Sequence, residues 1–295
     1  MSYGYDGSQR RSLLSRFVPL LIAVVLAGAF LFHGCEEGPF GRHRVVALAP
    51  EQEAALGAQA FRETLSQASV DRDPAINEAV GRVVRNLVRA TGDPGFLRHV
   101  NLEAREFEWK WSVVRSHEVN AFCLPGGKMV VYTGILPVAR TEAGLAVVMG
   151  HEISHALARH GSERMAQQRA VDIVRLGTIA SFSDMDYRTQ QGVMQAFNMG
   201  SQFGLLLPYS RNHESEADHM GLLLMSAAGY DPANAPKFWQ RMTEMSAGRS
   251  PPEFASTHPG HERRVAQLEE WQADARVLYR SATPAADADR PLPLP

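Results

Sequence analysis

The chain has little cysteine and no excess of charge of either sign. Only Cys35 and Cys123 occur in 295 residues, which excludes a disulfide scaffold and a thiolate-rich zinc finger. Lys and Arg number 30 against 32 Asp and Glu, and no basic run is longer than a pair. A nucleic-acid surface is therefore not expected, and any metal ion would have to be held by histidines and carboxylates.

One long apolar run lies near the N-terminus. Phe17 to Phe32 contains sixteen uncharged residues, and three arginines lie among residues 10–16. Such a segment is typical of membrane targeting. It fits an uncleaved signal anchor, a signal peptide cut after Ala29, or a lipoprotein signal ending at Cys35. In each case the positive end stays in the cytoplasm and the remainder is exported.

This run divides the chain into segments. We expect a cytoplasmic segment over residues 1–16, a signal anchor over 17–35 and a Gly/Pro-punctuated linker over 36–50. A globular domain should follow over 51–280, since 45% of the chain is hydrophobic. Residues 281–295 are rich in Ala, Pro and Asp, and we expect them to be disordered.

Periodicity predicts mostly helices in the globular part. Strands are expected near 107–113 and over 128–133. A tight Leu-Pro-Gly-Gly turn at residues 124–127 comes immediately before the second strand. The polar residues in 189–207 favour a core or membrane-surface helix over a second membrane span. Helices are expected over 51–67, from 74 to a stop at Gly92, from 141 to about 181, over 189–207, 214–229 and 233–248, and from 261 to about 281. The expected fold is α+β, mainly helical, with a small β-sheet.

The motif that carries chemistry is H-E-x-x-H at residues 151–155. On a helix, His151 and His155 lie one turn apart on the same face, so both imidazoles can bind one Zn²⁺. Glu152, next to the first histidine, can then reach a water at the metal. A catalytic zinc ion takes three protein ligands, so a third ligand is expected downstream.

Several residues could supply that third ligand. Glu214 and Asp218 are spaced one helical turn apart, so that one can bind zinc while the other accepts the free N–H of a ligand histidine. His160 would lie about 180° around the helix from His151 and cannot share its face. Glu216 would face away from Glu214 and is expected to be solvated or ion-paired. The candidates are His160, His213, Glu214, Glu216, Asp218 and His219.

These motifs together resemble the gluzincin metallopeptidases of the HtpX and CAAX prenyl protease family, especially its exported or membrane-anchored Oma-type branch. The resemblance covers roughly residues 51–270. It rests on H-E-x-x-H, on E-S-E-A-D at 214–218, on N-A-F-x-x-P-G-G at 120–127, on the His-Gly of R-H-G, and on T-H-P-x-x-x-x-R at 257–264. The chain lacks the multiple membrane spans of the prenyl protease and HtpX branches, which argues against prenylated substrates. Cys123 stands where the family has an apolar residue.

The resemblance implies a zincin-type domain with its sheet beside the active-site helix and one catalytic Zn²⁺. It implies that His151, His155 and Glu214 bind the metal and that Asp218 accepts a hydrogen bond from a ligand histidine. It also implies that an edge-strand element binds extended or unfolded polypeptide substrate; its residues are Asn120, Gly126 and Gly127.

These residues predict a zinc-dependent endopeptidase that acts in protein quality control. Glu152 would be the general base. The enzyme would be a single-pass membrane protein whose catalytic domain faces out of the cytoplasm, on the periplasmic side in a bacterium. The alternative is a zinc-stabilised binding module, which has no need of a general base at Glu152. Three roles stay open for His258: a latch on the metal, a donor to the oxyanion, or a structural cap.

Overall fold

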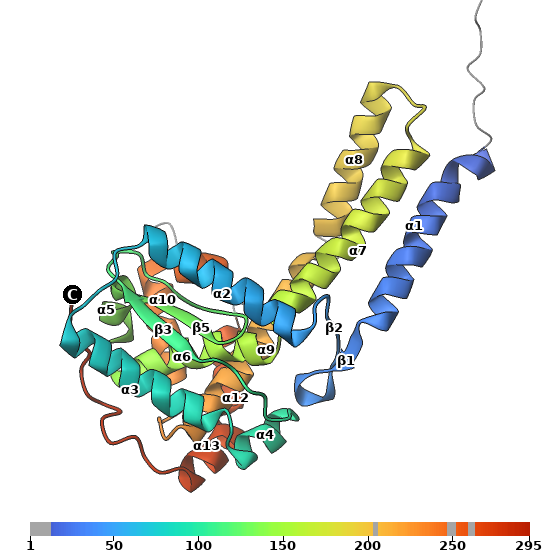
Figure 1. Ribbon diagram of the computed structural model, residues 1–295. Helices are drawn as coiled ribbons and strands as arrows, with labels where there is room; N and C mark the ends of the chain where they lie inside the picture. The colour runs from blue at the N-terminus through green and yellow to red at the C-terminus, as the bar shows by residue number, and fades with distance from the viewer. Residues whose placement is uncertain (1–12, 203–205, 247–251, 259–262) are drawn as a thin grey trace, which may run out of the picture. The chain divides into compact units, whose positions relative to one another are not determined.

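The computed structural model describes residues 13–202, 206–246, 252–258 and 263–295, and Figure 1 labels its main helices and strands. Residues 1–12 of the expected cytoplasmic segment and residues 203–205 of the expected 189–207 helix lie outside the described residues. The chain forms two compact units. Among the described residues, one unit comprises 37–43, 48–162, 210–246, 252–258 and 263–295; the other comprises 13–36, 44–47, 163–202 and 206–209.

The elements of the described residues confirm a mainly helical fold with a small sheet. In chain order they are α1 (Leu13–His33), β1 (Cys35–Glu37), η1 (Pro39–Gly41), β2 (His43–Val45), α2 (Pro50–Gln67), α3 (Pro74–Ala90), α4 (Pro94–Val100), β3 (Lys110–Val114), β4 (Ala121–Leu124), β5 (Lys128–Tyr132), η2 (Thr133–Ile135), α5 (Leu136–Ala139), α6 (Glu142–Leu157), α7 (His160–Ser181), α8 (Tyr187–Ser201), α9 (Leu207–Ala227), α10 (Asn234–Ser246), α11 (Glu253–Thr257), α12 (Arg264–Glu270) and α13 (Gln272–Ser281).

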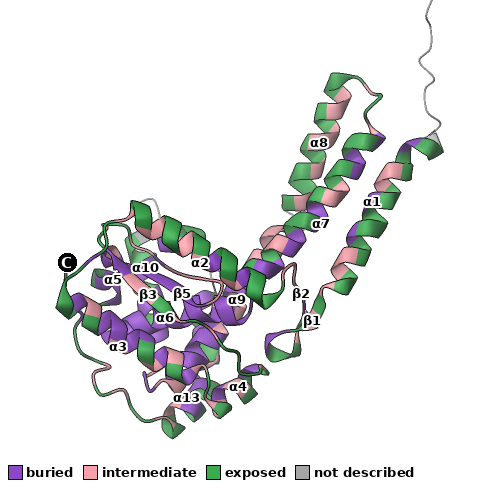
Figure 2. Cartoon of the chain, in the orientation of Figure 1, coloured by how far each residue is buried: buried purple, intermediate pink, exposed green. Residues whose placement is uncertain are grey.

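Helix α6 is the centre of the larger unit. It packs against α3, α5, α10 and β4, and all of its residues are buried except His155 (Figure 2). Helix α3 faces it with an apolar stripe that includes Val80, Val83 and Leu87. Asp73 caps α3 by accepting hydrogen bonds from the amides of two residues in its first turn, as the Asp-Pro start predicted. The H-E-x-x-H motif is thus held in a rigid core.

The sheet has three strands in the order β3-β5-β4, with β3 parallel and β4 antiparallel to β5. Ala121 pairs with Val131 and Leu124 with Lys128. The strand pattern predicted β3 and β5, whereas β4 was implied only by the family resemblance. Strand β4 lies at the edge of the sheet and packs against α6, so it borders the helix that carries the H-E-x-x-H motif.

The C-terminal segment departs from the expected disorder. Glu142 and Ala143, at the start of α6, donate their amides to the carbonyls of Arg290 and Ala288 at 3.1 and 2.8 Å. Leu292 donates to the carbonyl of Arg140 at 2.9 Å, and its side chain is buried. The first amides of a helix have no partner within the helix. The C-terminal segment supplies those partners, and this accounts for its order.

The second unit is built from α1, α8 and most of α7. Arg16 pairs with Asp184 at 2.9 Å, and the amide of Leu20 donates to Ser181 Oγ at 3.1 Å. Gly177 lies against Ala23, so close that an added Cβ would meet it at 2.4 Å. Along α1 the contacted residues rise from 16 to 23 while their partners fall from 184 to 177, so α1 and α7 are antiparallel. Leu14–His33 within α1 is long and apolar enough to cross a membrane, and no other described helix meets that test.

Helix α8 does not fill a core. None of its residues is buried, and Figure 2 shows it largely exposed. The expectation of a core helix over 189–207 is therefore wrong for the part that the structure describes, although an uncharged stretch from Thr189 to Gln202 remains compatible with a membrane surface.

Candidate active site

Helix α6 places the two motif histidines next to each other. Nε2 of His155 lies 3.0 Å from Nε2 of His151, because residues i and i+4 share a helix face. His151 is fully buried, and 11% of the His155 side chain is exposed. Both imidazoles therefore aim the same nitrogen at one point.

Helix α9 brings a carboxylate to that point. Glu214 Oε2 lies 3.2 Å from His151 Nε2, and Glu214 Oε1 lies 3.5 Å from His155 Nε2. One turn later, Asp218 Oδ1 lies 2.9 Å from His151 Nδ1, the ring nitrogen that faces away from the convergence point. Glu214 therefore faces the Nε2 atoms of both motif histidines, and Asp218 faces the opposite nitrogen of His151.

A third histidine arrives from α11. His258 follows the last residue of that helix, and its amide caps it by donating to the carbonyl of Phe254. Its Nδ1 lies 3.0 Å from Glu214 Oε2 and 3.2 Å from His151 Nε2. One ligand atom from each of His151, His155, Glu214 and His258 lies within 4.8 Å of the others, so the four form a cluster that could hold a metal ion.

The donor set fits a divalent metal ion. Glu214 Oε1 is buried and makes no hydrogen bond with any described residue, which is costly unless a cation or donor meets it. Two imidazole nitrogens 3.0 Å apart cannot both be protonated and point at each other without repulsion. Imidazole and carboxylate are the ligands of catalytic zinc sites.

Asp218 and Glu214 control the protonation of His151. Burial lowers the pKa of this imidazole, but hydrogen bonds to Asp218 and Glu214 outweigh it and raise the pKa to about 10. The pKa of Glu214 is well below its ordinary value, because its hydrogen bonds to His151 and His258 outweigh burial. The site therefore keeps a carboxylate charged at its centre.

Glu152 lies beside the cluster, and only one of its two carboxyl oxygens accepts a hydrogen bond from a described residue. Its Oε2 accepts a hydrogen bond from the Cys123 amide at 3.3 Å, while Oε1 is buried without a hydrogen bond to a described residue. The Nε2 of His258 lies 3.4 Å from that oxygen. Burial raises the pKa of Glu152 above its ordinary value, toward the range in which a carboxylate works as a general base.

Arg264, the last residue of the T-H-P-x-x-x-x-R motif, ties the cluster together. Its Nε donates to Asp218 Oδ2 at 2.5 Å, its Nη2 to Glu214 Oε2 at 3.1 Å and its Nη1 to the carbonyl of His258 at 3.1 Å. The guanidinium lies over the ring of Trp239, 3.8 Å from its centroid. Sequence reasoning assigned Arg264 no role in the site, although the spacing of the motif marked it.

The expected substrate-binding glycines lie in the turn before β5. Gly126 and Gly127 have φ values of +77° and +82°, which favour glycine. An added Cβ would lie 2.8 Å from the Cα of Ala54 at Gly126, and 2.7 Å from the Trp109 ring at Gly127. The structure thus shows the turn packed against α2 and Trp109, and contact with substrate stays a prediction for both glycines.

Asn120 immediately precedes β4. Its carbonyl accepts the amide of Tyr132, and its Oδ1 accepts the amide of Ala121 at 2.9 Å. Because alternate residues of a strand bond to opposite sides, Ala121 and Cys123 direct their backbone groups to the open edge. At this open edge, the Cys123 amide donates a hydrogen bond to Glu152 Oε2.

His160 does not lie where sequence reasoning placed it. Helix α6 ends at Leu157, and His160 begins α7 after Arg159 with φ of +58°. The helix is therefore broken, and His160 Nδ1 lies 2.8 Å from His155 Nδ1. Glu216 is ion-paired, as expected, with Arg42 Nε at 2.8 Å.

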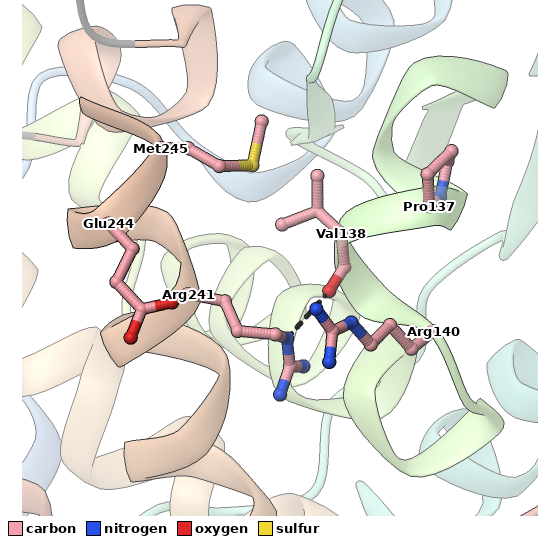
Figure 3. A pocket seen from close by; sticks show the side chains of 6 residues that line it. All are labelled: Pro137, Val138, Arg140, Arg241, Glu244 and Met245. Carbon is pink, nitrogen blue, oxygen red and sulfur yellow. Dashed lines mark hydrogen bonds between the residues drawn. The ribbon is translucent and has the colours of Figure 1, made fainter. Parts of the chain in front are cut away.

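A separate pocket of about 230 Å³ lies between α5 and α10. Figure 3 shows Arg241 donating to the carbonyl of Val138 at its wall, with Arg140 opposite. None of the four cluster residues lines it, and we assign it no part in the chemistry.

Comparison with known proteins agrees with this geometry. Residues 80–272 match Peptidase family M48. The chain is 35% identical over 256 residues to the mitochondrial metalloendopeptidase OMA1 of Schizosaccharomyces pombe, across 85% of this chain and 70% of the relative. It is 27% identical over 293 residues to the OMA1 of Saccharomyces cerevisiae, across 95% and 82%.

A bacterial relative is also similar. The chain is 28% identical over 265 residues to the beta-barrel assembly-enhancing protease of Escherichia coli, across 87% of this chain and 52% of the relative. The family match includes the H-E-x-x-H helix and, in α9, Glu214 and Asp218. The chain therefore belongs to peptidase family M48 and is a metalloendopeptidase of the OMA1 type.

Proposed function

We propose that this protein is a zinc-dependent endopeptidase in which His151, His155 and Glu214 bind Zn²⁺ and Glu152 is the general base. The observation that carries the proposal is the convergence of the three ligand atoms beside a buried carboxyl oxygen that no described residue satisfies. Two imidazoles and one carboxylate form a common ligand set of zinc peptidases.

The chemistry divides between the metal and Glu152. When bound, zinc acts as a Lewis acid that polarises the scissile carbonyl and makes water more acidic. Glu152 accepts the proton of the attacking water and passes it to the leaving amine. The hydrogen bond from the Cys123 amide holds Oε2 of Glu152 in place, and Oε1 is then the oxygen that exchanges the proton.

Strand β4 is suited to holding the substrate. It is an edge strand next to α6, and its open side runs past Glu152. An extended peptide can add to such an edge through backbone hydrogen bonds, which depend little on side chains. We infer that the substrates are unfolded segments of misfolded or membrane-associated proteins, with Asn120 at the end of the binding edge.

His258 gives the site a resting state. Its Nδ1 is within 3.2 Å of both Glu214 and His151, and its backbone caps α11 rather than α12. We expect its imidazole to complete the donor set in the resting enzyme and to give way when substrate binds.

Helix α1 is the proposed membrane anchor. Its apolar stretch Leu14–His33 follows a basic segment, so the positive-inside rule directs the catalytic unit out of the cytoplasm. In a bacterium, that side is the periplasm.

The test uses the full chain purified in detergent and a reduced, carboxymethylated protein as an unfolded substrate. We expect cleavage of this substrate, loss of cleavage with a chelator, and recovery on adding Zn²⁺. The folded form of the same substrate serves as the control and should resist. An enzyme that binds one zinc ion per chain yet leaves the unfolded substrate intact would refute the proposal.

A further inference from the structure

His160 is turned back toward the catalytic helix by a local break in the chain. Arg159 adopts a left-handed conformation (φ +58°), which is uncommon outside glycine. It is held there by Glu53 of α2, whose Oε1 accepts from Nη2 of Arg159 at 2.7 Å and from Nε at 3.1 Å. The break is therefore built by a buried ion pair, and it delivers His160 to His155.

The contact between the two imidazoles fixes their protons. Nδ1 of His155 and Nδ1 of His160 lie 2.8 Å apart, so one must donate and the other accept. His155 aims Nε2 at the cluster, and that nitrogen must be unprotonated to bind a metal ion. Its proton then lies on Nδ1 and is donated to His160.

The far side of His160 continues the chain of contacts. With Nδ1 accepting, the proton of neutral His160 lies on Nε2, which faces Glu216 Oε2 at 3.7 Å. This is an electrostatic contact longer than a hydrogen bond. Arg42 Nε donates to the same oxygen at 2.8 Å, and His213 stacks on the His160 ring with centroids 4.3 Å apart. His160 is almost completely buried, so its orientation is set by these neighbours.

We propose that His160 is the positioning residue of His155, with Glu216 orienting His160 in turn. This rests on the proposed role of His155 as a metal ligand. The arrangement matches the other ligand: Asp218 meets Nδ1 of His151 at 2.9 Å, and His160 meets Nδ1 of His155. Each ligand imidazole then has a polar group within 2.9 Å of its Nδ1, and such a neighbour can hold the ring and its tautomer.

The experiment measures metal affinity, not proteolysis. The full chain in detergent is stripped of metal, and the Kd for Zn²⁺ is determined by competition with a chromophoric chelator. His160→Phe keeps a ring against His213 but loses the acceptor, and we expect a Kd about 10- to 100-fold higher. His160→Gln keeps an acceptor oxygen, and we expect it to recover most of that loss. The absorption spectrum of the Co²⁺-loaded protein should change in His160→Phe and less in His160→Gln.

A matched pair of carboxylate variants tests the second link. Glu216→Gln and Glu142→Gln each remove the charge from a carboxylate whose side chain is buried and paired with one arginine. Glu216 lies 2.8 Å from Arg42, and Glu142 lies 2.7 Å from Arg82. Glu142 lies at the far end of α6 from the motif. We expect a raised Kd for Glu216→Gln and an unchanged one for Glu142→Gln. This comparison holds even if His160→Phe fails to fold.

The outcomes separate this inference from the proposed function. If His155→Ala abolishes zinc binding but His160→Phe, His160→Gln and Glu216→Gln all bind like the wild type, the positioning role is wrong and the metal site stands. Equal losses in His160→Phe and His160→Gln would also overturn it, because the acceptor would then not matter. If His155→Ala binds zinc as tightly as the wild type, the ligand assignment itself fails.

Discussion

Arg264 holds Asp218 by a hydrogen bond from Nε to Oδ2 of 2.5 Å, and both side chains are buried. The same guanidinium donates to Glu214. One guanidinium therefore donates to both Glu214 and Asp218, the two α9 carboxylates that face His151.

Arg264→Gln should destabilise the metal-free protein strongly. It removes the arginine partner of two buried carboxylates, and breaking a buried ion pair by removing one partner typically costs about 3–5 kcal/mol. Denaturant unfolding in the presence of a chelator measures the loss, and saturating Zn²⁺ should reduce it. Arg290→Gln, which breaks an exposed pair with Asp287, is the control and should change stability by less than about 1 kcal/mol. Equal effects of the two variants would contradict the role given to Arg264.

Glu214 and Asp218 of α9 should respond differently to amide substitution. Glu214→Gln removes a charged ligand and should leave the protein without stoichiometric zinc after dialysis. Asp218 supplies no ligand atom in the proposed site; Asp218→Asn removes the charge that faces His151 Nδ1 and Arg264 and should weaken zinc binding by about 10- to 100-fold. Metal content and a chelator competition measure both. Retention of zinc by Glu214→Gln, with loss in Asp218→Asn, would reverse the assignment.

His258→Ala should raise the basal rate of proteolysis. Its imidazole lies within hydrogen-bond distance of Glu214 and His151, and in the proposed resting state it would have to leave before water and substrate reach the metal. Initial rates on the unfolded substrate give kcat and KM. A lower kcat with an unchanged KM would instead favour donation to the oxyanion. Unchanged rates with a lower Tm would leave only a structural role.

The stack of Phe40, His219 and Trp271 should make stability depend on pH. His219 lies between the two rings, with centroid distances of 4.6 and 4.4 Å, and burial lowers its pKa to about 4. Below about pH 6.5 the unfolded chain takes up a proton that the folded chain refuses. Stability therefore falls as pH drops from 6.5 toward 4, by about 1–2 kcal/mol at pH 5 after allowing for partial exposure.

His219→Phe keeps the stack and removes this titration. Denaturant unfolding of the chelator-treated wild type and variant at pH 7 and pH 5 isolates the contribution of His219, because the other titrating groups are common to both. The variant should lose less stability between the two pH values. An identical loss in both proteins would show that His219 titrates freely in the folded state.

The central residues of the site could be predicted because their geometry is local. His151 and His155, like Glu214 and Asp218, are separated by four residues, and a helix places such pairs on one face whatever surrounds it. The choice of Glu214 as the ligand and of Asp218 as the partner needed the family resemblance.

The parts that escaped prediction depend on contacts between distant residues. The break before His160 needs a left-handed arginine held by a glutamate 106 residues earlier, and nothing in the residues next to Arg159 indicates it. The order of the C-terminal segment comes from the unpaired amides at the start of α6. The composition of the segment predicts disorder, because composition carries no information about the α6 amides that the segment pairs with.

The most direct test of the account compares the wild type with Glu152→Gln for zinc content and for cleavage of the unfolded substrate. Glu152 is not among the four residues of the ligand cluster, so the variant should keep one zinc ion per chain. It should lose about 10²- to 10⁴-fold in kcat, because an amide cannot accept the proton of water. Glu142→Gln should match the wild type in both measurements. Cleavage by Glu152→Gln at the wild-type rate, with zinc bound, would contradict the proposed mechanism.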